Sequence, residues 1–178
     1  MGGNCTCAGD ESVHRVLMLG LKYAGKSTIL NIIKGDQQIR TFQVNDFNTQ
    51  TIKWEDFDLV TWDLGSAEKQ RPLWRHYYDG SVAVIFVVDC SDKEKIQLAK
   101  TEIHKIAAVP ELTDCPILFL ANKQDIDGAI DQEELEKLID AGGTKHLTYS
   151  VMPCSATTNK GIDDAFDWLF NKIKEHIK

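Results

Sequence analysis

The sequence contains no hydrophobic run long enough to cross a membrane. Its longest clear apolar stretch, residues 82–88, has the length of a strand, whereas a bilayer span needs about 20 residues. Positively charged residues are outnumbered: the sequence has 20 lysines and arginines against 27 aspartates and glutamates, and its formal net charge is −7. That balance argues against a nucleic-acid partner held by bulk positive charge. The N-terminal residues lack the apolar core of a secretory signal, so we expect a cytoplasmic protein.

The number and spacing of the cysteines argue against two common uses of this residue. The five cysteines are odd in number, and Cys5 and Cys7 are one residue too close together for C-x-x-C redox or zinc chemistry. The other three, Cys90, Cys115 and Cys154, lie at the edges of expected strands, where cysteine behaves as a small buried hydrophobe. A reducing cytosol fits this usage best.

The 178 residues contain no internal repeat, linker or low-complexity tract, and their number favours one domain. We expect residues 1–12, which are small and polar, to form a flexible tail and residues 13–178 to form the domain. A capping box at residues 91–94, with Ser91 as the cap, is predicted to open the third helix. The apolar patterns predict strands at 13–19, 46–54, 57–63, 82–88, 115–121 and 147–153, and helices at 26–34, 67–78, 92–108, 131–140 and 161–177.

More than half of the expected strands are continuous apolar runs, which is typical of parallel strands covered on both faces. The strands at 46–54 and 57–63 are joined by a short polar turn and are expected to form an antiparallel hairpin at the edge of the sheet. The predicted fold is therefore a doubly wound α/β domain with a six-stranded, mostly parallel sheet and five flanking helices. Ligands bind such sheets beyond the carboxyl ends of the strands.

Residues 20–27, GLKYAGKS, match the phosphate-binding pattern G-x-x-x-x-G-K-[ST]. The motif follows an apolar run and precedes a helical pattern, which is the context that such a loop requires. Its glycines let successive backbone N–H groups turn toward phosphate oxygens, Lys26 adds a mobile ammonium, and the hydroxyl of Ser27 offers a ligand to Mg²⁺. The residues expected to hold the phosphates are Lys22, Tyr23, Ala24, Gly25, Lys26, Ser27 and Thr28.

Three further groups follow expected strands, at the same edge of the sheet as this loop. Asp63 ends the strand at 57–63, where a carboxylate is placed to hold Mg²⁺ through water. Asp125 can accept two hydrogen bonds from the Watson–Crick edge of guanine, a donor pair that adenine lacks. The aliphatic stem of Lys123 can cover the face of the base, and residues 154–157 offer backbone N–H groups beside it.

With these motifs the chain resembles the Ras-like small GTPases and, within them, the Arf (ADP-ribosylation factor) and Arf-like family. The resemblance covers about residues 14–177, and its most specific part is RPLWRHYY at 71–78, together with WDLG at 62–65, IFVVD at 85–89 and NKQD at 122–125. It implies a P-loop NTPase small G-domain that binds GTP or GDP with Mg²⁺ and acts as a molecular switch. Such a switch recruits effectors at a membrane surface under the control of exchange factors and GTPase-activating proteins, and we expect a monomer.

The resemblance also implies roles for individual residues. Asn122 and Asp125 would read the base, and Lys26 would contact the β- and γ-phosphates and act in catalysis. Gly65 and Ser66 would lie against the nucleotide, with the N–H of Ser66 near the γ-phosphate. The other positions matched to the family are the base-contacting Ser155 and Ala156 and the apolar effector triad Phe47, Trp62 and Tyr77.

The chain departs from the family pattern in its switch regions. Val44 stands where the family has a threonine that ligates Mg²⁺, so one ligand is lost, and a neighbouring polar group such as Thr41 or Asn45 could replace it only if the loop shifts. Ala67 stands where the family has the glutamine that orients the attacking water, and a methyl group cannot do so. Lys22 replaces an aspartate and is a candidate for stabilising charge on the γ-phosphate, the alternative being a solvated loop lysine.

We therefore expect GTP to be bound but hydrolysed slowly without assistance. The alternative is a nucleotide-locked interaction module, a pseudo-GTPase that holds GTP as a structural cofactor and presents the apolar triad to partners. A P-loop kinase or ATPase is disfavoured by the guanine-type motif at 122–125.

The first six residues, MGGNCT, match the N-myristoylation signal M-G-x-x-x-[ST] with Gly2 as the acceptor. One myristoyl chain holds a protein at a membrane only marginally, so a second signal is needed. Residues 2–12 lack the apolar spacing of an amphipathic helix, which leaves Cys5 and Cys7 as candidate palmitoylation sites. Dual acylation would place the protein peripherally on a Golgi, endosomal or plasma membrane, and a flexible unmodified tail is the alternative.

Overall fold

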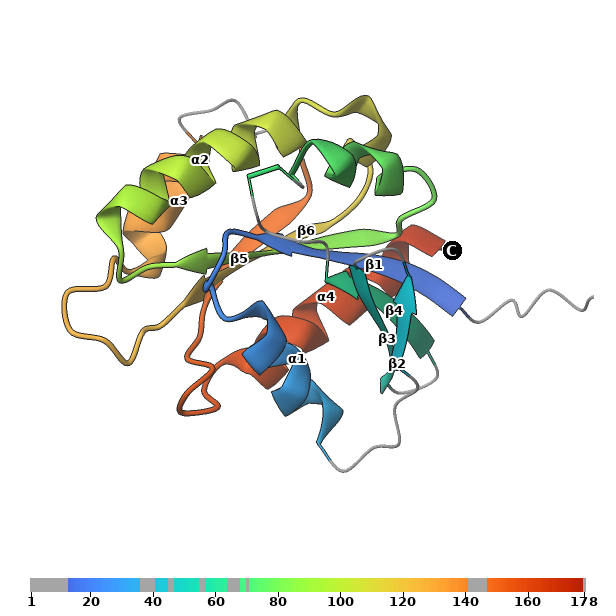
Figure 1. Cartoon of the computed structure of the whole chain (residues 1–178), viewed down its shortest axis with the longest axis horizontal. Helices are drawn as coiled ribbons and strands as arrows, with labels where there is room; N and C mark the ends of the chain where they lie inside the picture. Colours follow the sequence, from blue (N-terminus) through green and yellow to red (C-terminus); the bar gives the residue numbers. More distant parts are fainter. Residues whose placement is uncertain are drawn as a thin grey trace, which may run out of the picture.

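The structure is a computed structural model that describes residues 13–35, 41–44, 47–54, 57–63, 68–69, 71–140 and 147–177. Within these residues seven strands form one sheet in the order β2-β3-β4-β1-β5-β6-β7 (Figure 1). The strands are β1 (Val13–Gly20), β2 (Thr41–Val44), β3 (Phe47–Trp54), β4 (Phe57–Asp63), β5 (Ala83–Asp89), β6 (Ile117–Asn122) and β7 (Tyr149–Pro153).

The sheet is mostly parallel, as expected from its apolar strands. β1 pairs in parallel with β4 and β5, and β6 pairs in parallel with β5 and β7. β3 is antiparallel to β4, so the predicted hairpin is present, but it does not end the sheet because β2 pairs antiparallel with the outer side of β3. The described sheet thus has seven strands rather than the expected six. β2 is only four residues long, which is too short to show a periodic pattern in the sequence. It forms a strand because it pairs with β3.

The described helices are α1 (Lys26–Lys34), α2 (Lys93–Ala107), α3 (Gln132–Asp140) and α4 (Ile162–Ile177), with two short 3₁₀ helices, η1 (Arg71–Tyr77) and η2 (Pro110–Leu112). The α-helix expected at 67–78, the second of the five expected helices, is therefore corrected to the 3₁₀ segment η1. Helices of this type are short connectors, and η1 is anchored by the buried side chain of Trp74 rather than by a long amphipathic face. Trp74 meets the ring of Phe86 on β5 edge-on, with 6.4 Å between the ring centroids.

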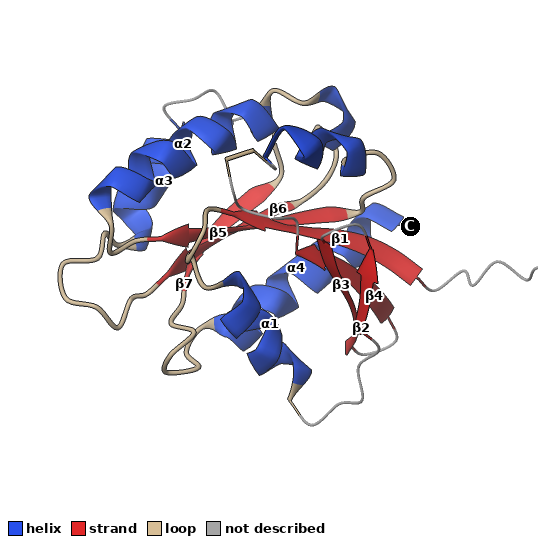
Figure 2. Ribbon diagram, viewed as in Figure 1, coloured by secondary structure: helices blue, strands red, loops and turns tan. Residues whose placement is uncertain are grey.

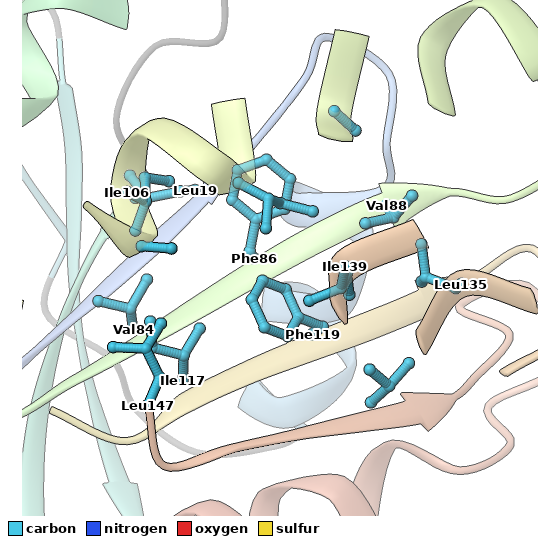
Figure 3. Close-up of a cluster of buried hydrophobic side chains, with 14 of the residues drawn as sticks. Leu19, Val84, Phe86, Val88, Ile106, Ile117, Phe119, Leu135, Ile139 and Leu147 are labelled. Atoms are coloured by element: carbon cyan, nitrogen blue, oxygen red, sulfur yellow. The ribbon is translucent and has the colours of Figure 1, made fainter. Parts of the chain in front are cut away.

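The helices cover both faces of the sheet. α2 and α3 lie on one face and α1 and α4 on the other (Figure 2). Because side chains alternate along a strand, Leu17 and Leu19 of β1 join the cluster under α2 and α3, whereas Val16 and Met18 join the cluster under α1 and α4. Figure 3 shows the first cluster, in which Phe86 and Phe119 lie at its centre between the helices and the sheet. Every residue of β5 and β6 is buried, so both strands form a rigid base for the loops that follow them.

The start of α2 differs from the expected capping box. Asp92, not Ser91, is the N-cap, and its carboxylate accepts hydrogen bonds from the backbone N–H groups of Glu94 and Lys95. The side chain of Ser91 turns away from the helix and donates to Asp89 instead. Ser91 and Asp92 are both residues that favour the N-cap position, and in the structure Asp92 occupies it.

Candidate functional site

The candidate site lies at the carboxyl ends of the parallel strands. The loop 20–25 leads from β1 into α1, the loop 122–125 follows β6, and the segment 153–156 follows β7. These strands share one edge because β1, β5, β6 and β7 are successive parallel neighbours in the sheet. Three of the predicted site segments therefore meet in space, although Ala24 and Asn122, which bond to each other, are already 98 positions apart in the sequence.

The loop 20–25 is a tight turn that only glycine permits at two positions. Gly20 has φ +142°, and a Cβ on it would lie 2.5 Å from the carbonyl oxygen of Val87. Gly25 has φ +104°, and a Cβ on it would lie 2.2 Å from Asn122 Nδ2. Tyr23 is exposed and also has a positive φ, of 67°, which is uncommon for an aromatic residue. The glycines thus serve close packing against neighbouring strands as well as the turn itself.

The loop 20–25 encloses the ammonium group of Lys26. The ammonium of Lys26 donates to the carbonyl oxygens of Gly20 and Leu21, both at 3.3 Å, and Lys26 is 7% exposed. Ser27 and Thr28 lie exposed in the first turn of α1, at the positive end of the helix dipole. A buried ammonium beside the positive end of a helix is suited to a multiply charged anion such as a polyphosphate.

Asn122 joins the three segments to one another. Its Nδ2 donates to the carbonyl oxygen of Ala24 at 2.7 Å, and its Oδ1 accepts from the N–H of Ala156 at 3.0 Å and from the thiol of Cys154 at 3.7 Å. The side chain is 1% exposed. Its polar atoms are therefore used to hold loops together, and the N–H of Ala156, expected to face the base, is engaged in the same link.

Asp125 borders a hollow of about 310 Å³ next to this link. One of its carboxylate oxygens accepts from the hydroxyl of Ser155 at 2.6 Å, and that hydroxyl accepts from the N–H of Thr158 at 3.1 Å. Asp125 as a residue is exposed, so a ligand can reach it. The hollow is also lined by Cys154 and Lys160, and its volume lies at the lower end of the range for small-molecule pockets.

Lys123 is held by Asp89, a residue that no sequence motif assigns to the site. Its ammonium donates to Asp89 Oδ2 at 2.7 Å, and its backbone has a positive φ of 70°. Asp89 ends β5, and a charged residue directly after the run IFVV was the available signal. Burial would raise the pKa of the Asp89 carboxyl, but hydrogen bonds from Lys123 and Ser91 outweigh burial and hold that pKa below its ordinary value.

Comparison with known proteins identifies the family. The sequence model described as "Arf: ADP-ribosylation factor family" matches residues 6–173. The chain belongs to the ADP-ribosylation factor family. It is 42% identical over 159 residues to ADP-ribosylation factor J of Dictyostelium discoideum and 40% identical over 159 residues to ADP-ribosylation factor K of the same organism, in each case covering 89% of this chain and 85% of the relative.

A solved structure agrees with this assignment. The Arl6 BBS3 small GTPase from Trypanosoma brucei, solved with the bound nucleotide analogue GppNp, matches with a TM-score of 0.81 and 31% sequence identity. The match covers 92% of this chain and 99% of that one. The chain is therefore a small GTPase of the Arf family, a guanine-nucleotide-binding switch with the α/β fold described above.

Several family positions lie outside the described residues. Gly65, Ser66 and Ala67 are among them, as are Asn45 and the tail residues Gly2, Cys5 and Cys7. The backbones of four further positions are described, but their side chains are not; they are Val44, Phe47, Trp62 and Asp63.

The backbone still places some of these Arf-family positions. Asp63 pairs with Met18 across the β4–β1 ladder, two residues before Gly20, so it ends at the same edge of the sheet as the loop 20–25. Val44 pairs with Phe47, which puts both at the closed end of the β2–β3 hairpin. Tyr77, the described member of the expected effector triad, is half-buried at the end of η1.

Two further observations concern Lys22 and the helices of this Arf-family chain. Lys22 is an exposed residue of the loop 20–25, and its ammonium lies 4.9 Å from the ring centroid of Tyr23. No helix of the described ranges combines the length and the apolar character that crossing a bilayer requires.

Proposed function

We propose that this Arf-family switch binds GTP or GDP together with Mg²⁺ and hydrolyses GTP slowly on its own. The observation that carries the proposal is the link through Asn122, because it holds the phosphate-type loop at Ala24 and the base-type segment at Ala156 at a set distance. A ligand that spans both segments must carry a polyphosphate at one end and a flat polar base at the other.

The role that each residue would have in binding follows from which of its groups a ligand can reach. Asp125 would accept from the guanine edge, while Ser155 orients its carboxylate and Asn122 holds the loops rather than the base. The stem of Lys123 would cover one face of the base. The phosphates would lie along the backbone of residues 22–28, with Lys26 turning from its loop carbonyls to the β- and γ-phosphates. Gly65 and Ser66 would complete this site.

The residues present fit Mg²⁺. Ser27, which is exposed at the start of α1, and Asp63, whose backbone ends at the same edge of the sheet, carry hard oxygen ligands of the kind that Mg²⁺ prefers. Bound there, the ion would neutralise charge on the phosphates. Ser27 would ligate it directly and Asp63 through water.

Guanine recognition is tested by calorimetry on the purified chain. We expect GTP and GDP to bind and ATP to bind far more weakly, since adenine would leave the Asp125 carboxylate unpaired. Asp125→Asn should lower affinity for guanine nucleotides by about 100-fold or more, and should favour xanthosine nucleotides, whose carbonyl can accept from the new amide. Equal binding of ATP and GTP would contradict the proposal.

Slow hydrolysis follows from the two departures in the switch regions. Ala67 has no group to orient water, and Val44 has no oxygen for Mg²⁺. Single-turnover assays on the wild type, Ala67→Gln, Val44→Thr and the double variant separate the two effects. We expect the double variant to be fastest, and Ala67→Gln alone to gain only if Val44 is not also limiting. Lys22→Ala tests whether that lysine stabilises γ-phosphate charge or is merely solvated. If every variant hydrolysed GTP at the wild-type rate, these positions would not be the cause of slow hydrolysis.

The second candidate is a nucleotide-locked module that holds GTP as a structural cofactor. It is favoured by Val44, by Ala67 and by Ser66, which stands where the family has a glycine and restricts the backbone turn that glycine permits. Under either function Phe47, Trp62 and Tyr77 would present an apolar surface to effectors, and exchange factors and GTPase-activating proteins would act on the cycling form. The nucleotide extracted from the purified chain, and its release with and without Mg²⁺, distinguishes the two. GTP retained after chelation of Mg²⁺ supports the locked module, and ready exchange supports the switch.

The tail completes the proposal. Residues 13–178 would form the G-domain, and residues 1–12 a tail that carries myristate on Gly2 and palmitate on Cys5 and Cys7. Two acyl chains would hold this monomer peripherally on a membrane from the cytoplasmic side. Mass spectrometry of the N-terminal peptide from the native cells tests this, since an unmodified peptide would remove the basis for membrane attachment.

A further inference from the structure

A buried carboxylate lies directly under the expected base-binding loop. Asp89 ends β5, is paired in register with Asn122 on β6, and has a side chain only 2% exposed. Lys123 donates to one of its oxygens at 2.7 Å, and the hydroxyl and N–H of Ser91 donate to the other at 2.6 and 3.2 Å. Lys95 on α2 approaches at 3.5 Å.

This arrangement restrains Lys123 through Asp89, a residue that is not expected to touch the nucleotide. The Lys123 backbone sits in the left-handed region with φ 70°, which is strained for a side chain that bears a Cβ. Its side chain is 28% exposed, and its ammonium is engaged with the buried carboxylate. A long lysine side chain otherwise samples many rotamers, and ordering it during binding would reduce affinity.

We propose that Asp89 is a positioning residue that fixes Lys123 across the base pocket and thereby sets how long guanine nucleotide stays bound. The inference rests on the proposed nucleotide-binding role of the loop 122–125. Asp89 touches no ligand itself; it acts through Lys123. A Lys123 stem that is already ordered can cover one face of a bound base without a further loss of side-chain entropy, so losing this order should appear mainly as faster dissociation of the nucleotide.

The neighbouring Asp92 supplies a matched control. It belongs to the same charged group, because it pairs with Lys95 at 2.9 Å, and it caps α2. Its carboxylate bonds to Lys95 and to the helix amides, whereas that of Asp89 bonds to Lys123. Asp92→Asn therefore perturbs the helix and the charge but leaves the contact with Lys123 in place.

The experiment measures release of radiolabelled GDP from the full chain in the presence of Mg²⁺, together with urea unfolding of each variant. We expect Asp89→Asn, which keeps an acceptor but loses the charge, to speed release by about 5- to 30-fold, and Asp89→Ala to speed it at least as much. Asp92→Asn should leave the release rate within about twofold of the wild type.

A double-variant cycle separates positioning from a general loss of stability. If Asp89 acts through Lys123, Asp89→Asn should add little to the release rate once Lys123→Met is present. Additive effects, or release unchanged in Asp89→Asn, would overturn the inference while leaving nucleotide binding intact. Failure of the wild type to bind GDP would instead overturn the proposed function. If Asp89→Ala does not fold, Asp89→Asn and the cycle still decide the question.

Discussion

At the scale of single residues, Gly25 and Asn122 depend on each other. The amide of Asn122 occupies the space in which a Cβ at position 25 would lie, at 2.2 Å, and it uses that closeness to reach the carbonyl oxygen of Ala24. The turn and the link between loops are thus one feature, and a change at either residue should disturb both.

The first prediction is that Gly25→Ala weakens guanine-nucleotide binding by at least about 100-fold. The methyl group would displace the Asn122 amide, and the φ of +104° adds backbone strain. Calorimetry with GDP measures the loss. Gly128→Ala is the control, because Gly128 also has a positive φ but has no atom within 4 Å of an added Cβ. Equal losses from both variants would show that strain alone, and not the clash with Asn122, is responsible.

The second prediction concerns thiol reactivity. Burial, with added repulsion from Cys154 and Asp89, raises the pKa of Cys90 to about 12, and burial raises the pKa of Cys154 to about 12. Both thiols are therefore protonated at neutral pH, and only the thiolate is a good nucleophile. We expect iodoacetamide at pH 8 to leave Cys90 and Cys154 unmodified in the folded chain and to alkylate both in urea, as read from peptide masses. Rapid labelling of the folded chain would contradict the buried placement.

At the scale of elements, α4 shows what fixes the helices to the sheet. Its buried residues, which include Phe166, Leu169 and Phe170, pack under the sheet with Met18 and Leu120, while Asp167 on the same helix is exposed. The helical spacing of these apolar residues was visible in the sequence, and α4 lies within a residue of the expected bounds.

The third prediction is that Leu169→Ala lowers the free energy of unfolding by about 2–5 kcal/mol. The substitution removes buried methyl groups and leaves a cavity in a core that is fully closed at this position. Asp167→Ala should change that free energy by no more than about 0.5 kcal/mol. Urea denaturation followed by circular dichroism gives both values, and similar losses from the two variants would argue against the assigned face of α4.

The elements that the sequence predicted least well are those with little signal of their own. β2 exists through pairing with β3, η1 is held by Trp74 against Phe86, and the cap of α2 was assigned to the neighbouring serine. In each case a contact with another element, or a choice between two adjacent residues, decided the outcome. Local propensity carries no information about such contacts.

At the scale of the whole molecule, η1 and α2 enclose ionisable groups that tie stability to pH. Burial, and next the negative charge of Glu102, raises the pKa of Tyr78 to about 12. Arg71 and Lys105 flank the same Glu102 carboxylate, at 3.6 and 3.0 Å. This group joins η1 to α2, and the first turn of α2 carries Lys95, whose ammonium lies 3.5 Å from the Asp89 carboxylate.

The fourth prediction is a loss of stability at alkaline pH. A tyrosine whose pKa is raised on folding contributes stability that is complete below its unfolded pKa of about 10 and is lost as the pH approaches 12. The raised pKa values of Cys90 and Cys154 act in the same direction from about pH 9 upward. We expect the urea midpoint to fall between pH 9 and pH 11, and to fall less in Tyr78→Phe. An identical pH dependence in that variant would contradict the assignment to Tyr78.

The sequence by itself determined the family, the fold class and the order of the binding motifs, because these depend on local patterns: apolar runs, the glycines of the loop 20–25 and the motif 122–125. Tertiary structure alone decided that Asn122 joins the loops and that Asp89 holds Lys123. These contacts link residues 98 and 34 positions apart, and they form only when parallel strands bring their carboxyl ends to one edge. A motif names the groups available for binding, and the fold decides which remain open to a ligand and which are used to hold the others in place.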